Sequence, residues 1–281
     1  MTIHLGCAVW SFPGWTGELY PTGTRSKDYL SLYSKYFPAV EGSTTFYAVP
    51  PIKTLEKWQA ETPADFRFCL KLPRDFTHSG LLVPQLPKAI GFLELVDEFL
   101  VDKLGLVFVQ LPPGYQPKKM PDLSKFLTNL VKVGVPLALE VRNLEWFQPA
   151  ASAELQKMLA GLGIGQVTLD TQAIYQTAAD SELPFICKKP QVPLLTAPTS
   201  MIRYVSHPRQ AVNEPFLRAW ADLLKEWPAD IDTYFFVHCP IEEHSPSNAR
   251  YVRQIFQEQG LTVHNLPWQA PETEQLGLNL V

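Results

Sequence analysis

Apolar positions along the chain alternate between two spacings. One kind is a short run rich in β-branched and aromatic side chains, which is typical of a buried strand. The other is longer and repeats its apolar residues every three or four positions, which is typical of an amphipathic helix. The predicted strands are residues 3–10, 40–46, 66–72, 104–110, 135–142, 164–170, 201–205 and 233–238.

Predicted helices fill the intervals between these strands, at residues 28–37, 51–60, 88–102, 123–133, 150–162, 214–227 and 247–259. A strict alternation of strands and helices favours a parallel sheet. Eight strands, each followed by a helix or its replacement, predict the α/β class and a single (β/α)8 TIM-type barrel domain over residues 1–281. A doubly wound open sheet is the alternative. The pattern breaks at residues 171–200, where a long irregular loop carrying Lys188 and Lys189 is expected to replace the sixth helix.

Polar side chains recur at the carboxyl ends of the predicted strands. Side chains alternate faces along a strand, so Glu140 and Arg142 point the same way. In a barrel this end of the strands, here called the barrel mouth, is where ligands bind. With the more aliphatic face of each strand taken as outward, the inward residues at the mouth are Trp10, Glu41, Ser43, Thr45, Lys71, Gln110, Glu140, Arg142, Asp170, Arg203 and His238. Two interpretations stay open: a functional site, or a closed network of ion pairs that fills the barrel.

The charged residues of this set suggest roles. Lys71, Arg142 and Arg203 are expected to bind a phosphate or carboxylate, because guanidinium groups pair with such anions in a bidentate way. Gln110 and His238 are further candidates for substrate contacts. The candidate catalytic acids and bases are Glu140, Glu41, Asp170 and His78, the last in the loop after the third strand.

Aromatic residues gather at the strand ends and in the loops that follow them. Trp10, Tyr47 and Trp146 are candidates for stacking on a sugar face or a base. The alternative is that these rings, with Phe12, Trp15, Phe46 and Phe147, pack the loops onto the barrel rim.

Charge and cysteine usage narrow the class of protein. The net charge of −4 gives no overall attraction to nucleic acid or an anionic membrane. The four cysteines are widely spaced, which favours reduced thiols over a disulfide framework. We see neither a signal peptide nor an apolar run of membrane-spanning length, so a cytoplasmic protein is expected.

Cofactor signatures are lacking in the sequence. It contains no phosphate-binding loop and no dinucleotide fingerprint, so no nucleotide cofactor is predicted. His238 and Cys239 with His244 lack the ligand spacing of a recognised metal site, so no metal is predicted. A magnesium ion held partly by a substrate phosphate stays open. Cys239 is either a nucleophile beside His238 or a small residue at the mouth.

Several stretches together resemble the YecE-like proteins, catalogued as domain of unknown function 72. The resemblance runs from residue 3 to about residue 255 and rests on 10-WSFPGW-15, 40-VEGSTTFY-47, 66-FRFCLK-71, 77-TH-78, 109-VQLPP-113, 140-EVR-142 with Trp146, 169-LD-170, 202-IR-203 and 236-FVH-238. It implies a TIM barrel with Glu41, Lys71, His78, Gln110, Glu140, Arg142, Asp170 and Arg203 at the mouth. Two stretches depart from the usual pattern: 6-GCAVW-10, where many relatives have Gly-x-Ser-Gly-Trp, and 238-HC-239, where many have paired asparagines.

The resemblance implies a fold and no particular reaction. The leading hypothesis is therefore an enzyme, a hydrolase, lyase or isomerase, that acts on a small anionic, phosphorylated or carbohydrate substrate bound at the mouth. One alternative is a barrel that binds or processes nucleic acid, with Lys188 and Lys189 touching phosphates. The other is a non-catalytic metabolite-binding protein.

Overall fold

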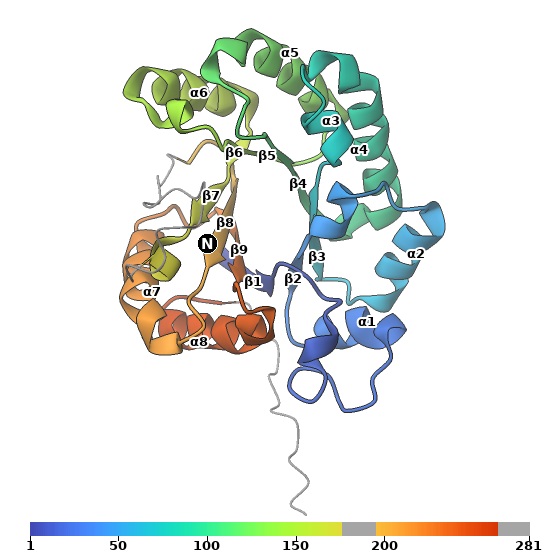
Figure 1. Ribbon diagram of the computed structural model, residues 1–281, viewed down its shortest axis with the longest axis vertical. Helices are drawn as coiled ribbons and strands as arrows, with labels where there is room; N and C mark the ends of the chain where they lie inside the picture. The colour runs from blue at the N-terminus through green and yellow to red at the C-terminus, as the bar shows by residue number, and fades with distance from the viewer. Residues whose placement is uncertain (176–194, 264–281) are drawn as a thin grey trace, which may run out of the picture.

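The structure is a computed structural model that describes residues 1–175 and 195–263. Within these residues nine parallel strands form one sheet in the order β6-β5-β4-β3-β2-β1-β9-β8-β7. The strands surround the centre of the molecule and the helices lie outside them (Figure 1). The strands are β1 (Thr2–Cys7), β2 (Ala39–Gly42), β3 (Arg67–Lys71), β4 (Leu104–Gln110), β5 (Leu137–Glu140), β6 (Gly165–Gln166), β7 (Thr168–Asp170), β8 (Thr199–Val205) and β9 (Asp232–His238).

The two shortest strands, β6 and β7, together make the sixth predicted strand. β6 pairs with β5, β7 pairs with β8, and the backbone is interrupted at Val167, whose N–H donates to the Leu139 carbonyl at 2.9 Å. The sixth predicted strand therefore pairs with β5 in its first half and with β8 in its second half, which brings the two ends of the sheet together. With β6 and β7 counted as one, eight strands surround the barrel axis, which confirms the predicted (β/α)8 barrel. The alternative prediction of an open doubly wound sheet is wrong.

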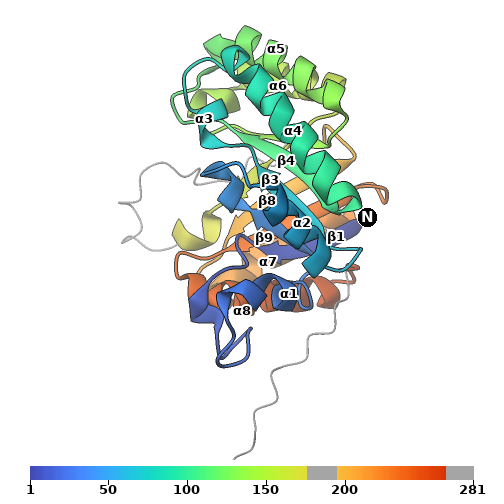
Figure 2. The same ribbon diagram turned by 90° about the vertical axis from the view of Figure 1, so that its right-hand side faces the viewer.

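The helices lie close to their predicted positions and cover the barrel from the side as well (Figure 2). Prolines stand in the first turn of α4, α5, α6 and α8, where a missing N–H costs no hydrogen bond. None of the described helices is both long and apolar enough to cross a membrane. The helices are α1 (Tyr29–Tyr33), α2 (Ile52–Glu61), α3 (Arg74–Thr77), α4 (Leu86–Leu100), α5 (Met120–Leu130), α6 (Pro149–Leu162), α7 (Gln210–Lys225) and α8 (Ser245–Glu258).

The connection after β7 is described only at its two ends. A 3-10 turn, Gln172–Tyr175, follows β7 directly, and the chain is described again from residue 195 to the start of β8. The expected contacts of Lys188 and Lys189 lie outside the described residues.

The apolar core has two parts. The larger part lies between the strands and the surrounding helices. The smaller part fills the barrel interior and consists of Ala39, Cys69, Leu106, Phe108, Ala138, Val167, Met201, Tyr234 and Phe236. Inward positions in the middle of the strands are therefore packed with apolar side chains, and the inward polar positions follow at the strand ends.

The close approach of β1 to β2 generates a prediction about Gly6. A Cβ atom at Gly6 would lie 2.1 Å from the Ala39 carbonyl oxygen, whereas a Cβ at Gly91, within α4, would meet nothing within 4 Å. We expect Gly6→Ala to lower the free energy of unfolding by about 1–3 kcal/mol, because the two strands must separate. Gly91→Ala should raise it by about 0.5–1 kcal/mol through helix propensity. Urea unfolding measures both, and equal effects of the two variants would contradict this packing.

Candidate functional site

Five ionisable side chains reach the barrel mouth from five different strands, and their positions along the strands follow one rule. Each lies two residues after a member of the interior apolar layer, so strand periodicity turns it to the same inward face one layer higher. The pairs are Ala39 and Glu41 on β2, Cys69 and Lys71 on β3, Ala138 and Glu140 on β5, Met201 and Arg203 on β8, and Phe236 and His238 on β9.

Arg203 is the centre of this cluster. Its Nε and Nη2 donate to Glu41 at 2.9 and 2.8 Å, and its Nη1 donates to Glu140 Oε2 at 2.8 Å. All three side chains are buried. One guanidinium therefore bridges two carboxylates that come from strands on different sides of the barrel.

Further polar side chains also donate to the two carboxylates. Arg142 Nε donates to Glu140 Oε1, and its Nη2 donates to Gln110 Oε1 at 3.3 Å. Ser43 Oγ donates to Glu41 Oε1 at 2.8 Å, and His238 Nε2 lies 2.9 Å from Glu41 Oε2. Because an ionised carboxylate only accepts, the histidine Nε2–H is the donor. The ion network, defined as Glu41, Glu140, Arg142 and Arg203, is thus closed by hydrogen bonds at each carboxylate.

The protonation of these carboxyl groups follows from their partners. Burial opposes the ionisation of Glu41, but Arg203 and His238 outweigh it and hold the pKa of Glu41 well below its ordinary value. Burial likewise acts against Glu140, while Arg203 and Arg142 lower its pKa. Both groups are ionised near neutral pH, so they stabilise positive charge better than they donate protons.

Lys71 stands beside the network without joining it. Its side chain is 8% exposed, and its Nζ lies 3.7 Å from the centroid of the Phe46 ring, as in a cation–π contact. Among the described residues no acceptor lies within hydrogen-bond distance of Nζ. Burial, followed by the charge of Arg203, lowers the pKa of Lys71 to about 8.

His78 contacts the same ring. It follows α3 directly, packs edge-on against Phe46 with the ring centroids 5.3 Å apart, and its Nδ1 lies 2.7 Å from Thr77 Oγ1. Burial and the charge of Lys71 lower the pKa of His78 below its ordinary value. A neutral imidazole and a weakly basic amine therefore share the Phe46 ring, a placement that the sequence pattern did not single out.

Asp170 is not brought to the other carboxylates. Its Oδ2 accepts from Trp220 Nε1 of α7 at 2.7 Å, and its Oδ1 accepts from the Gln172 N–H at 2.9 Å. Register explains the difference, since Arg203 of β8 is opposite Leu169 and Asp170 is opposite the outward Tyr204. The sequence interpretation put Asp170 on the inward face, whereas its position and partners are those of a residue that joins β7 to α7.

Of the three aromatic residues predicted to contact a ligand, two pack within the protein and one is exposed near the mouth. Trp10 packs edge-on against Trp58 of α2 and belongs to the outer core. Trp146 is 1% exposed and donates from Nε1 to the Tyr115 carbonyl at 2.7 Å, so it packs a loop onto the rim. Tyr47 is 83% exposed and packs edge-on against Phe46, next to Lys71. Of the three, Tyr47 alone is free to meet a ligand near the network.

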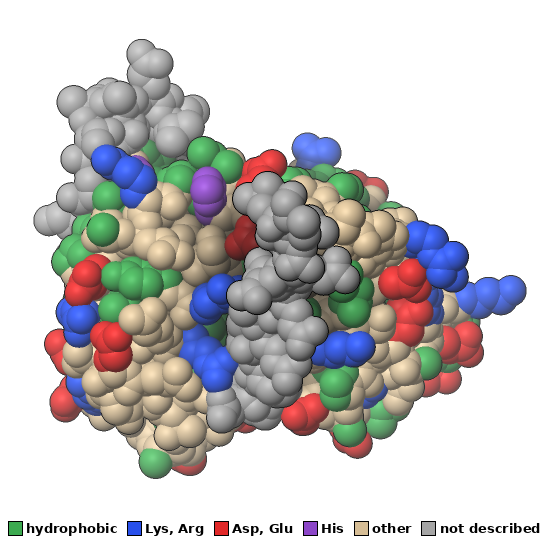
Figure 3. All heavy atoms as spheres, turned by 90° about the horizontal axis from the view of Figure 1, so that it is seen from below, with side chains coloured by type: hydrophobic (Ala, Val, Ile, Leu, Met, Phe, Trp, Pro, Cys, Tyr) green, Lys and Arg blue, Asp and Glu red, His purple; other side chains and the backbone are tan. Residues whose placement is uncertain are grey.

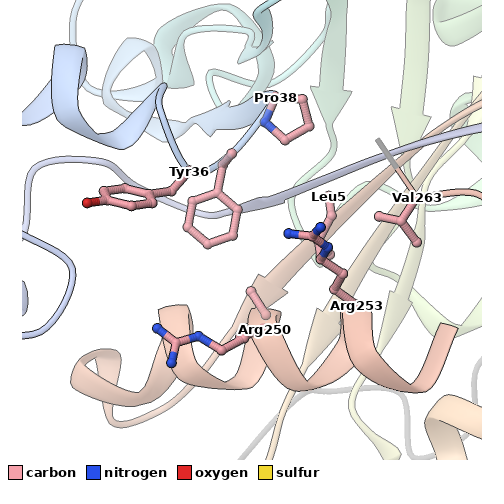
Figure 4. Close-up of a pocket in the computed structure, with 8 residues that line it drawn as sticks. Leu5, Tyr36, Pro38, Arg250, Arg253 and Val263 are labelled. Atoms are coloured by element: carbon pink, nitrogen blue, oxygen red, sulfur yellow. The ribbon is translucent and has the colours of Figure 1, made fainter. Parts of the chain in front are cut away.

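A separate cavity lies between β1 and α8 (Figure 4). It has a volume of about 10 Å³, room for about one water molecule, and its lining includes Leu5, Pro38 and Val263. This cavity is a packing gap and too small for a substrate.

Two broader features bear on ligand class. In the part of the chain that the structure describes, no group of three or more His, Cys, Asp or Glu side chains is arranged to hold a metal ion. On the face seen in Figure 3, the described acidic and basic side chains are interspersed and do not gather by sign. That face offers no continuous positive surface to a nucleic-acid backbone.

Comparisons with a family model and with curated proteins agree on one family for this chain. Residues 4–273 match the family described as Protein of unknown function DUF72. The UPF0759 protein YecE of Escherichia coli (strain K12) is 31% identical over 255 residues, which are 87% of this chain and 89% of that protein. The UPF0759 protein YunF of Bacillus subtilis is 34% identical over 157 residues, 52% of this chain and 53% of that protein.

Solved structures of DUF72 family proteins share the fold. One from Enterococcus faecalis has a TM-score of 0.71 at 18% identity and covers 95% of this chain and 98% of its own. One from Thermotoga maritima has a TM-score of 0.68 at 20% identity and covers 92% of this chain and 100% of its own. The barrel architecture is therefore common to these proteins.

Removal of the bridging guanidinium generates a stability prediction. Arg203→Met leaves Glu41 and Glu140 buried without their shared partner, and we expect it to lower the free energy of unfolding at neutral pH by about 3–5 kcal/mol. In the wild type the lowered pKa values of both groups contribute stability above pH of about 4.3, which is lost as the pH falls through the folded pKa values. In the variant Arg142 and His238 remain, but Arg203 no longer offsets burial, so both pKa values rise and the deficit should shrink as the pH falls toward about 5.

Urea unfolding at the two pH values measures this deficit. Arg218→Met is the matched control, because Arg218 pairs with Glu214 and Glu258 on the exposed surface, where ion pairs contribute little. A deficit for Arg203→Met that is no larger than that of the control, or that does not change with pH, would contradict the prediction.

Proposed function

This chain belongs to the DUF72 family of proteins of unknown function, and we propose that it is an enzyme that binds a small anionic substrate at the barrel mouth. The observation that carries the proposal is the charge left over after the ion network is closed. Arg203 pairs with Glu41 and Glu140, and Arg142 pairs with Glu140. Within residues 1–175 and 195–263, Lys71 is a third cation with no carboxylate of its own, so three cations face two carboxylates and one positive charge is uncompensated.

The uncompensated charge has donors that can reach a ligand. The Arg142 side chain is 24% exposed, and its Nη1 has no hydrogen-bond partner among residues 1–175 and 195–263. Lys71 Nζ is unpaired in the same part of the chain. Guanidinium and ammonium groups bind phosphate and carboxylate oxygens through charge-assisted hydrogen bonds, so a small phosphorylated or carboxylated molecule fits this site.

A catalytic role follows from which groups can move a proton. Glu41 and Glu140 are held ionised, and in this proposal they position Arg142 and Arg203 and stabilise positive charge. Burial lowers the pKa of Lys71 to about 8 and lowers the pKa of His78 below its ordinary value, so the imidazole is neutral at pH 7, and groups with shifted pKa values cluster at catalytic sites. In this proposal His78 accepts and returns a proton beside the bound anion.

The anion site is tested with sulfate, because sulfate keeps the same charge over the pH range that matters. Lys71→Met should weaken sulfate binding at about pH 7 by roughly tenfold, equivalent to about 1.4 kcal/mol, because the unpaired cation is gone. Binding to the wild type should also weaken as the pH rises through about 8, where Lys71 loses its proton. Isothermal titration calorimetry measures both effects.

Lys132→Met serves as the matched control. Lys132 is exposed, hydrogen-bonds Asn129 and precedes β5 at the end of the barrel opposite the mouth, so this variant removes the same charge elsewhere. Its affinity for sulfate should equal that of the wild type. The proposal fails if the two variants bind sulfate alike, or if the wild type binds none.

A further inference from the structure

Lys71 differs from Lys103, the other lysine buried in the described part of the chain, in the partners of its ammonium group. Both side chains are less than a tenth exposed, at 8% and 7%. Lys103 Nζ donates to the Gln59 carbonyl, to the Thr62 carbonyl at 2.6 Å and to Thr62 Oγ1 at 3.2 Å. Among the residues that the structure describes, Lys71 Nζ meets the face of Phe46 and no oxygen within hydrogen-bond distance. This fold can surround a buried ammonium with acceptors, and at the mouth it does not.

The surroundings of Lys71 favour the uncharged amine. Burial against the Phe46 ring removes water from Nζ, and the guanidinium groups of Arg203 and Arg142 repel a further positive charge. Glu140 and Glu41 act in the opposite direction, but both are already paired with arginines. With a pKa of about 8, roughly a tenth of the Lys71 side chains are free amines at pH 7. An ordinary lysine has well under a hundredth of that fraction.

A buried amine without acceptors beside a cationic group is the arrangement that activates lysine as a nucleophile toward carbonyl carbon. We infer that Lys71 forms a Schiff base with a small aldehyde or ketone that carries a phosphate or carboxylate group. The inference deepens the proposed function and rests on it, because the anionic group of the substrate is held at the same mouth, by Arg142.

The covalent step balances without any further reactant. The lone pair of Nζ attacks the carbonyl carbon, and the carbonyl π electrons move to oxygen, which takes up a proton to give a carbinolamine. Loss of that oxygen as water, with both protons of the original amine, forms the C=N bond. His78, which shares the Phe46 ring, is the group placed to carry these protons. Protonation of the imine restores a positive charge near Glu41 and Glu140, where the Lys71 ammonium stood.

Reductive trapping tests the inference directly. The full-length protein is incubated with glyceraldehyde 3-phosphate or, separately, with pyruvate, and sodium borohydride then reduces any C=N bond to a stable secondary amine. Peptide mass spectrometry locates the added mass. At limiting probe concentration and about pH 7 we expect Lys71 to be labelled at least about tenfold more than the exposed Lys132, because its free-amine fraction is larger. Comparison of the two probes distinguishes a phosphorylated aldehyde from a carboxylated ketone.

Lys71→Arg separates the covalent step from anion binding. The variant keeps a cation at the mouth and cannot form an imine, so it should retain sulfate binding within a few-fold and lose the trapped adduct at this position. Retained sulfate binding also shows that the variant is folded. Wild-type labelling of Lys71 no greater than that of Lys132 with both probes, while sulfate still binds, overturns the Schiff-base inference and leaves the proposed function standing. Trapping at Lys71 without any sulfate binding supports the nucleophile and overturns the anion site.

Discussion

The bridge from Arg203 to Glu41 and Glu140 is the interaction on which the end of the barrel depends. It joins β8 to β2 and to β5, so one side chain crosses the space between strands that do not pair with each other. Removing two carboxylates from water costs several kcal/mol for each ion, and the cost is offset only while every partner is in place. The network therefore specifies one arrangement of the strand ends, and the apolar layer below it excludes the water that would otherwise screen the charges.

That constraint also explains why a lysine can be left unpaired there. Each oxygen of both carboxylates already accepts a hydrogen bond, since Glu41 accepts from Arg203, Ser43 and His238, and Glu140 accepts from Arg203 and Arg142. Lys71 hydrogen-bonds neither group and lies in their electrostatic field, against Phe46. The rigidity of the network and the reactivity proposed for Lys71 thus have a common origin. Carboxylates that are paired with arginines stabilise the Lys71 ammonium less than unpaired carboxylates would.

Much of this architecture follows from the sequence through strand periodicity. Glu41, Lys71, Glu140, Arg203 and His238 each stand two positions after a small or apolar interior residue, and alternation alone places them together. The same reasoning fails at Asp170. The sixth predicted strand is interrupted at Val167, and as a result Leu169 is opposite Arg203 where Asp170 was expected. It fails at Trp10 and Trp146 because an aromatic ring at a strand end fits the outer core as well as a ligand, and only tertiary contacts decide. The role of Phe46 beneath Lys71 carries no periodic signal, since it depends on a loop conformation.

In the function that we propose, a ligand site and a closed ion-pair network are compatible descriptions of the mouth. They apply to different side chains at the same depth. A buried network perturbs its own members toward permanent charge, which suits them for positioning and makes them poor proton donors. The same positive charges push a neighbouring amine and imidazole in the opposite direction, toward their neutral forms. Groups that are neutral and nucleophilic near pH 7 need such a neighbour, because burial alone would leave nothing to hold an anionic substrate. We therefore propose Lys71 and His78 as the reacting groups of the mouth, with Glu41 and Glu140 positioning the arginines beside them.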